Sequence, residues 1–249
     1  MTTIILAAGY GTRLYPLTLN KPKALLEVGG KTILDRLLEK IEAVDESGEA
    51  VIVTNEKFHK SFQVWQSRHR SDIGIKVIND KTKSNETRLG AIGDINLVLE
   101  ETGTKEDLLI TGSDNLFGKD LDGFVRFSVA KRPFSTLALF DIKNKELAVK
   151  YGICDLNADS QVVGFEEKPL EPKTTLAASA LYFIPKEKIS KIREYMKTDL
   201  PKDAPGNLMK WLSTEDKVFG YVLKGAWYDI GDTESLRKAD EEFSKKGEA

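Results

Sequence analysis

The sequence predicts an α/β fold with a Rossmann-like, mainly parallel mixed sheet flanked by helices and a small β-rich insertion in the second half. Short apolar runs alternate with amphipathic helical patterns in the first half, which is typical of βαβ units. Several of these runs end in small or polar residues, as strands do where they enter ligand-binding loops. The second half contains more strands and more polar turns. We expect the 249 residues to form one domain with two halves, 1–134 and 135–249.

The elements of the first half follow from the spacing of apolar residues. A short apolar run bounded by turn residues indicates a buried strand, and apolar residues three or four apart indicate a helix. These patterns predict strands at 3–8, 50–54, 75–79 and 107–111, and helices at 32–44, 58–70 and 89–99.

The second half has a different pattern, because its strand-like runs are separated by longer polar stretches. Residues 141–159, between two of these strands, are rich in turn-forming and polar residues, and residues 201–205 read as a loop. We predict strands at 135–140, 161–165, 176–184, 218–223 and 227–230, with helices from about 186, at 207–212 and at 233–243.

Composition excludes several functional classes. The 37 basic and 39 acidic residues give a net charge of −2, which argues against nucleic-acid binding through bulk charge. Cys154 is the only cysteine, so neither an intrachain disulfide nor a cysteine metal cluster can form. The first residues do not resemble a signal peptide, and no apolar run approaches the roughly 20 residues of a membrane span. We therefore expect a cytoplasmic protein without nucleic-acid or membrane partners.

The loop after the first predicted strand has the composition of an anion site. Gly9 and Gly11 allow the backbone to approach a ligand, and consecutive free N–H groups can bind phosphate oxygens. Arg13 adds a planar guanidinium and Lys23 a compact charge. The third glycine of the dinucleotide fingerprint and the Walker pattern are both absent. The residues therefore predict a polyphosphate site, with a tight turn carrying solvated cations as the alternative.

The string LAAGYGTRLYPLTLNKPKALLEVGGKTILD, residues 6–35, resembles the signature of the nucleotidyltransferases that activate sugar 1-phosphates. The resemblance to short, single-domain members of this family extends along most of the chain. It makes 1–134 the nucleotide-binding half and 135–249 the acceptor-binding half. It also implies catalytic roles for Arg13 and Lys23, and substrate contacts from the rest of the loop: Leu6, Ala8, Gly9, Gly11 and Thr12.

Two further motifs imply a Mg²⁺ site. The segment ITGSDNLF resembles the strand-end motif whose aspartate binds Mg²⁺, and the matching residue is Asp114. WYDIGDTESL resembles the segment of the second metal ligand, with Asp229 as the match. Two carboxylates together with phosphate oxygens suit this hard cation. The alternatives are that each aspartate merely caps a helix or turn, and that the nearby Asp232 is the second ligand.

The acceptor site is also implied by resemblance. GFEEKP resembles the segment whose glutamate and lysine hold the sugar and its phosphate, and Pro169 leads us to expect an extended Lys168. The alternative for this segment is an exposed charged turn. RLGAIGDI resembles the family's base-contacting segment, and its alternative is a plain helix start with a glycine. The matching residues are Glu167 and Lys168, the pocket-lining pair Tyr151 and Gly152, and Leu89, Gly90 and Gly93 beside the base.

Two positions depart from the family pattern. Alanine occupies positions 178 and 180, where the family often has an asparagine and a glycine that line the sugar. An ordinary hexose is therefore in doubt as the acceptor.

The resemblance implies a Mg²⁺-dependent transfer between an NTP and a sugar 1-phosphate or similar acceptor, in a possible homo-oligomer. The alternatives are a cytidylyltransferase acting on a non-sugar phosphate such as phosphocholine or a polyol phosphate, and a non-catalytic nucleotide-sugar-binding regulator. An NAD-dependent oxidoreductase is disfavoured because the third glycine is missing.

Overall fold

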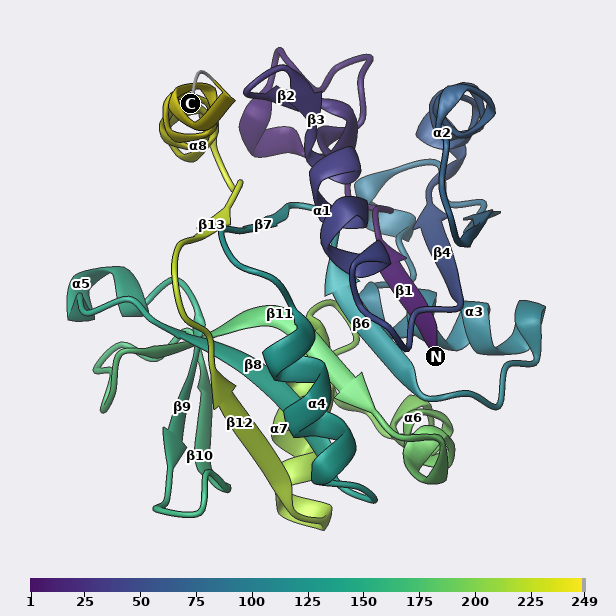
Figure 1. The fold of residues 1–249 in the computed structure, drawn as a ribbon. Helices are drawn as coiled ribbons and strands as arrows, with labels where there is room; N and C mark the ends of the chain where they lie inside the picture. The colour runs from purple at the N-terminus through teal and green to yellow at the C-terminus, as the bar shows by residue number, and fades with distance from the viewer. Residues whose placement is uncertain (248–249) are drawn as a thin grey trace.

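The computed structural model describes residues 1–247 and is built around one mixed sheet (Figure 1). The strand order is β10-β9-β11-β6-β1-β4-β5, and β8 pairs with β11 on one side and β12 on the other. Strands β6, β1, β4 and β5 run parallel, whereas β11 runs antiparallel to β6, β8 and β9. The predicted fold class, an α/β protein with a mixed, mainly parallel sheet, is confirmed.

The first half forms the parallel part of this sheet. Its strands in the main sheet are β1 (Thr2–Leu6), β4 (Glu49–Thr54), β5 (Gly74–Asn79) and β6 (Leu108–Gly112). Its helices are α1 (Ile33–Glu42), α2 (Glu56–Arg68), α3 (Ala91–Thr102) and α4 (Asp122–Ala130). Three short strands complete it: β2 (Glu27–Val28), β3 (Lys31–Thr32) and β7 (Asn115–Phe117).

The second half adds the antiparallel strands and the C-terminal helices. Its strands are β8 (Ser135–Asp141), β9 (Gly152–Leu156), β10 (Val162–Glu167), β11 (Leu176–Ile184), β12 (Val218–Val222) and β13 (Trp227–Asp229). Its helices are α5 (Lys145–Ala148), α6 (Ile189–Met196), α7 (Pro205–Glu215) and α8 (Thr233–Gly247).

The sheet separates two hydrophobic cores. Helices α3, α6 and α7 pack on one face, where Ile95, Ile192 and Leu208 are fully or almost fully buried. Helices α1, α2 and α4 cover the other face, through buried side chains such as Leu37 and Phe62. Both faces of the central strands are therefore covered, which explains their continuous apolar sequences.

The stretch at 141–159 corrects one sequence expectation. It contains the short helix α5 and the strand β9, which pairs along its length with β10 and at one point with β11. Strand β9 was missed because its apolar residues are few, and its pairing with both neighbours is a tertiary feature that the local sequence does not show. Helix α4 and the short strand β7 were also absent from the prediction. The helix predicted at 89–99 begins two residues later, at Ala91.

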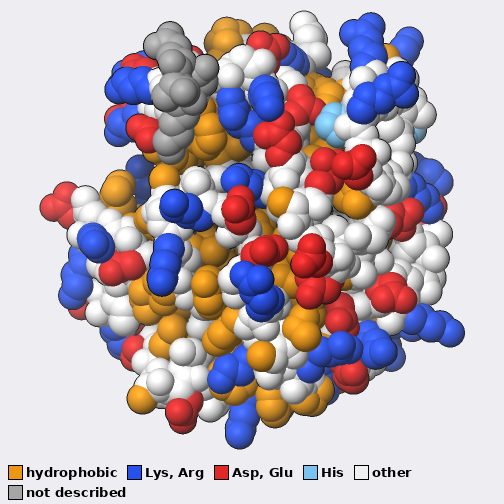
Figure 2. All heavy atoms as spheres, viewed as in Figure 1, with side chains coloured by type: hydrophobic (Ala, Val, Ile, Leu, Met, Phe, Trp, Pro, Cys, Tyr) orange, Lys and Arg blue, Asp and Glu red, His pale blue; other side chains and the backbone are white. Residues whose placement is uncertain are grey.

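Charged side chains of both signs are interspersed over the face shown in Figure 2. This distribution agrees with the near-balance of charge in the sequence. No helix in the described part of the chain combines the length and the apolar character needed to cross a membrane.

Candidate active site

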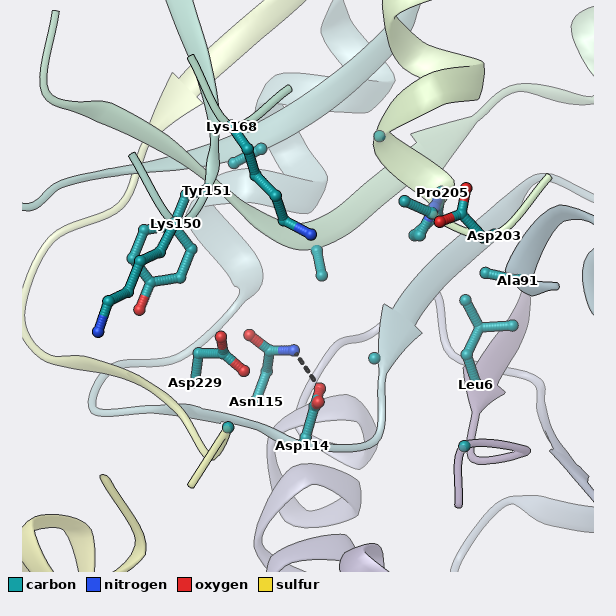
Figure 3. A pocket seen from close by; sticks show the side chains of 18 of the residues that line it. Leu6, Ala91, Asp114, Asn115, Lys150, Tyr151, Lys168, Asp203, Pro205 and Asp229 are labelled. Carbon is teal, nitrogen blue, oxygen red and sulfur yellow. Dashed lines mark hydrogen bonds between the residues drawn. The ribbon is translucent and has the colours of Figure 1, made fainter. Parts of the chain in front are cut away.

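A cavity of about 770 Å³ opens between the carboxyl ends of the parallel strands and the antiparallel part of the sheet. After the ligands expected from the sequence, we call the side lined by Leu6, Gly9 and Ala91 the nucleotide wall, and the side lined by Tyr151 and Lys168 the acceptor wall. In Figure 3, Leu6 and Ala91 lie on one side of the cavity, and Lys150 and Tyr151 lie on the other. A ligand site at this edge is expected for an open α/β sheet.

The loop after β1 is shaped by its glycines and by bonds to neighbouring strands. Gly11 has a φ of +62°, a left-handed conformation that disfavours larger residues, and its carbonyl accepts a 2.7 Å bond from Thr18 Oγ1. Asn55, at the end of β4, donates from Nδ2 to the carbonyl of Ala8 at 2.8 Å. Among the described residues, the N–H groups of Gly9, Tyr10 and Gly11 donate no intramolecular hydrogen bond. They are therefore available to an anion.

The two cations of the predicted polyphosphate site lie on different sides of this loop. Lys23 lines a smaller cavity of about 90 Å³ together with Gly9, Gly11 and Asp114. Arg13 lines the main cavity, and its Nη1 is 3.5 Å from the position that a side chain on Gly231 would occupy. Gly231 therefore lies beside the guanidinium, with room for an ordinary van der Waals contact between them.

A short chain of polar contacts fixes Asp114, which follows β6. Lys23 Nζ lies 2.6 Å from Asp114 Oδ2, and Asn115 Nδ2 donates to Asp114 Oδ1 at 2.9 Å (Figure 3). Asn115 Oδ1 in turn accepts a 2.7 Å bond from Trp227 Nε1. These contacts orient the carboxylate, and the ammonium of Lys23 compensates its charge.

The pairing of β7 with β13 brings Asp229 to the same place. Asp229 is the register partner of Asn115, and the N–H of Ile230 donates to the carbonyl of Asp114 at 3.0 Å. Burial and then the negative charge of Asp114 raise the pKa of Asp229 to about 6, against the opposing effects of Lys23 and Arg13. A separate two-stranded sheet therefore assembles the two aspartates.

Asp232 has a different environment from Asp229, although both line the cavity. Its Oδ1 accepts a 2.8 Å bond from the N–H of Ser235 at the start of α8, and this bond lowers its pKa. Asp232 is largely occupied as a helix cap. The geometry therefore favours Asp229 over Asp232 as the partner of Asp114.

The aspartate pair has the donor chemistry of a Mg²⁺ site. Two carboxylates at a cavity wall, one with a raised pKa, together form a site whose charge favours a cation. Among the described residues no group of three or more His, Cys, Asp or Glu side chains could hold a metal. Mg²⁺ commonly keeps waters and takes substrate phosphates in addition to one or two carboxylates, so a pair is sufficient.

Glu167 lies in a narrow slot on the acceptor wall. A Cβ on Gly152 would come within 2.8 Å of Glu167 Oε2, and one on Gly206 within 3.1 Å. Burial raises the pKa of Glu167, with Lys168 acting in the opposite direction. The two glycines, from β9 and α7, therefore leave room for this carboxyl at the cavity.

Lys168 corrects the expectation of an extended backbone before Pro169. Its φ is +48°, and its N–H donates to the carbonyl of Tyr151 at 3.0 Å. This tertiary bond outweighs the local preference of a residue before proline. The bond joins the end of β10 to the start of β9, and the Lys168 side chain points into the cavity (Figure 3).

Strand β11 is irregular where it lines the cavity. Its register with β8 shifts between Ala178 and Tyr182, and Ala180 within the shift has a φ of +51°. Ala178 and Ala180 both line the cavity, so the two departures from the family pattern lie at this site.

The structure gathers most of the predicted site residues. The main cavity is lined by Leu6, Ala8, Gly9, Arg13, Gly90, Asp114, Tyr151, Gly152, Glu167, Lys168 and Asp229, and the adjoining small cavity by Gly11 and Lys23. Thr12 and Leu89 are exposed and line neither cavity, and Gly93 is buried within α3 outside both.

Other cavity residues escaped the sequence prediction. Asn115 and Lys150 are adjacent to predicted site residues, and that adjacency is a usable signal. The sequence gave no signal for Asp94, because acidic residues are common in the first turn of any helix.

Comparison with known proteins is consistent with this geometry. The chain is 28% identical over 231 residues to the bifunctional protein GlmU of Methanocaldococcus jannaschii, covering 93% of this chain and 51% of that protein. It is 28% identical over 250 residues to GlmU of Methanococcus aeolicus, covering 98% of this chain and 55% of that protein. The chain thus spans about half the length of these relatives.

A crystal structure titled as a putative glucose-1-phosphate thymidylyltransferase from Bacillus anthracis, in complex with sucrose, has the same fold. The two structures superpose with a TM-score of 0.83 at 20% sequence identity, and the match covers 98% of this chain and 96% of the Bacillus anthracis chain. The pattern of the nucleotidyl transferase family matches residues 2–246. The chain therefore belongs to the nucleotidyl transferase family and is a nucleotidyltransferase.

Proposed function

We propose that this nucleotidyltransferase joins an NTP to a sugar 1-phosphate, or a similar small phosphate monoester, and releases pyrophosphate. The observation that carries the proposal is the meeting of three features at one cavity. These are the glycine loop with its free N–H groups, the Asp114–Asp229 pair, and Lys168 on the opposite wall. The name of the Bacillus anthracis protein, which includes glucose 1-phosphate, agrees with this substrate class.

The nucleotide wall binds the triphosphate. The free N–H groups of the loop after β1 donate hydrogen bonds to phosphate oxygens, and Arg13 and Lys23 hold the charge that develops on pyrophosphate as it leaves. Lys23 contacts Asp114 in the free protein, so binding of phosphate requires the ammonium to be shared or released. Because Lys23 has a negatively charged partner before and after phosphate binds, its ammonium is never buried without one, which avoids the desolvation cost of an unpaired charge.

The acceptor wall holds the incoming phosphate. Lys168 reaches into the cavity and fixes this dianion, while Glu167 and Tyr151 line the space for the rest of the molecule. A phosphate monoester is mostly dianionic at pH 7, since its second pKa is about 6, and no general base is needed for its attack on the α-phosphorus. Rate enhancement then comes from positioning and charge compensation.

We propose that Asp114 and Asp229 hold Mg²⁺. When bound, the ion neutralises the phosphate oxygens of the NTP so that the two anions can approach. The remaining work belongs to the chain. Asn115 and Trp227 orient Asp114, and the β7–β13 pairing fixes Asp229 beside it.

The test is pyrophosphate release with a panel of NTPs and phosphorylated acceptors, with and without MgCl₂. We expect turnover that needs the NTP, the acceptor and the metal together. Nucleotide binding without turnover for every pair would favour a regulator on this fold and contradict the proposal.

A further inference from the structure

Asp94 is a buried carboxyl for which the proposed reaction gives no role. It lies in the first turns of α3, its residue is 5% exposed, and it lines the main cavity. Within the described residues its Oδ1 is buried without a hydrogen-bond partner. Burial, and to a lesser extent the charge of Asp80, raises the pKa of Asp94 to about 8.

The protein does not compensate this carboxyl internally. The helix N-terminus cannot serve it, because the N–H groups of Ala91 and Ile92 donate to the carbonyls of Asp203 and Lys202. An unpaired buried carboxyl lowers the stability of the folded chain, and replacing it with an uncharged residue would remove that cost. Its presence therefore suggests that it binds something. A ligand with hydrogen-bond donors would satisfy it.

The position of Asp94 identifies the part of the ligand involved. It lines the cavity with Leu6, Gly90 and Ala91 on the nucleotide wall, and Figure 3 shows Leu6 and Ala91 across the cavity from Lys150 and Tyr151. The triphosphate occupies the loop after β1, so the remaining part of the nucleotide at this wall is the nucleoside.

Arg88 provides a second, complementary group at the same wall. It lines the cavity two residues before Gly90 and is exposed, with one hydrogen bond to Asn85. The cavity therefore offers a guanidinium donor and a carboxyl acceptor on the two sides of Gly90–Ala91.

We propose that Asp94 and Arg88 select a guanine base, so that GTP is the preferred nucleotide. Guanine presents two adjacent donors, N1–H and the 2-amino group, which match the two oxygens of Asp94 in its ionised form, and hydrogen bonds to that form favour ionisation when the base binds. Its O6 and N7 acceptors match the guanidinium, the commonest specific contact to this base. The inference rests on the assignment of the nucleotide wall to the NTP.

The other bases satisfy this pair less completely. In uracil and thymine a single N3–H lies between two carbonyls. One of these carbonyl oxygens would therefore face the second carboxylate oxygen, which places two acceptors together. Adenine and cytosine place a ring nitrogen acceptor beside their amino group, with the same conflict. Each good bidentate contact discriminates by about 10–100-fold.

The decisive experiment changes the hydrogen-bonding groups of residue 94 by substitution and those of the base by using a different nucleotide, so that the two match again. Asp94→Asn presents one donor and one acceptor, which match xanthine, whose 2-oxo group replaces the 2-amino group. We expect wild type to prefer GTP over ATP, CTP and UTP, with inosine triphosphate about 10-fold worse. Asp94→Asn should lose about 10–100-fold in kcat/KM for GTP and prefer xanthosine triphosphate. Rescue by that nucleotide also proves that the variant folds.

The matched control is Glu234→Gln, which makes the same charge change at a cavity residue in the first turn of α8 and should leave the nucleotide ranking unchanged. A wild type that prefers another base, or an Asp94→Asn variant with an unchanged ranking, would overturn the inference. Calorimetric binding of the same nucleotides without acceptor separates the two proposals. Tightest binding of GTP without turnover contradicts the reaction alone, whereas turnover without preference for GTP contradicts the guanine assignment alone.

Discussion

The two walls of the cavity are built with different kinds of backbone structure. On the nucleotide wall, left-handed backbone conformations fall on glycines, with φ of +62° at Gly11 and +79° at Gly90. On the acceptor wall they fall on residues with side chains, with φ of +48° at Lys168 and +51° at Ala180. A non-glycine residue in this region costs about 1–2 kcal/mol.

The difference shows where this chain retains strain. The nucleotide wall offers free backbone N–H groups, to which we propose that the triphosphate binds, and glycine forms this backbone without strain. The acceptor wall keeps strained residues because their side chains reach the cavity, as Lys168 does in Figure 3. Strain held at a site in this way points to selection for function at that wall.

The largest effect is expected where the two walls join, at the β7–β13 pair. Asp114→Asn and Asp229→Asn are nearly isosteric and should fold, yet each should lose about 10³-fold or more in metal-dependent kcat because a charged ligand of Mg²⁺ is removed. The measurement is pyrophosphate release as a function of MgCl₂ concentration. Asp232→Asn, which removes a charge at the cavity but keeps the oxygen that caps α8, is the control. An inactive Asp232→Asn beside an active Asp229→Asn would assign the second ligand to Asp232.

The next effect tests the nucleotide wall alone. Arg13→Ala and Lys23→Ala should each lower kcat by about 10²–10³-fold, the usual loss for one transition-state donor. Lys21→Ala is the matched control, because Lys21 is exposed and pairs with Glu27 outside the cavity. Steady-state kinetics with saturating NTP measure the effect. Unchanged turnover in both variants, with intact circular dichroism spectra, would remove the polyphosphate site from this loop.

A third prediction concerns the cost of the unpaired carboxyl on the nucleotide wall. Asp80 is the titratable group whose charge acts on Asp94, and Arg88, Tyr182 and Asp203 line the same cavity as Asp94. A raised folded-state pKa means that the folded chain binds the proton more tightly than the unfolded chain. The contribution of Asp94 to stability is therefore fully present below about pH 4 and is lost as the pH rises to about 8.

Asp94→Asn removes this titration. Since one pKa unit corresponds to about 1.4 kcal/mol, the variant should be more stable than wild type by a few kcal/mol at pH 8 and by much less at pH 4.5. Chemical denaturation at the two pH values, without nucleotide, measures the difference. A stability gap that does not change with pH would show that Asp94 is ionised in the folded protein at pH 4.5 as well.

The sequence predicts the two walls to different degrees, for physical reasons. The parallel strands and the loop at Gly9–Arg13 are local features, because a buried strand and a glycine turn both depend on adjacent residues. The acceptor wall depends on tertiary contacts. Strand β9 exists through its pairing with its neighbours, and the backbone of Lys168 is set by a bond to Tyr151.

The site follows the same division. The spacing of Asp114 and Asp229 in sequence gives no indication of the two-stranded sheet that joins them. The role inferred for Asp94 depends on its burial beside a cavity, which no residue pattern reveals.

The smallest predicted effect tests the strain on the acceptor wall. Ala180 has a left-handed backbone, so Ala180→Gly should stabilise the chain by about 1 kcal/mol, whereas glycine within a regular strand usually destabilises by a similar amount. The same change removes a Cβ from the cavity. Together with Ala178→Asn, which adds an amide able to bond two hydroxyls, it should raise kcat/KM for hexose 1-phosphates by about 10-fold.

The comparison that isolates this effect uses four proteins: wild type, each single variant and the double variant. Each is assayed with glucose 1-phosphate and with smaller phosphate monoesters at a fixed concentration of the preferred NTP. Ala177→Gly is the control for the backbone effect, because Ala177 lies in a regularly paired part of β11 and outside the cavity, so glycine there should destabilise and leave acceptor preference unchanged. If wild type already uses glucose 1-phosphate as well as any other acceptor, the two alanines do not exclude a hexose. The strain at Ala180 then has a cause other than acceptor selection.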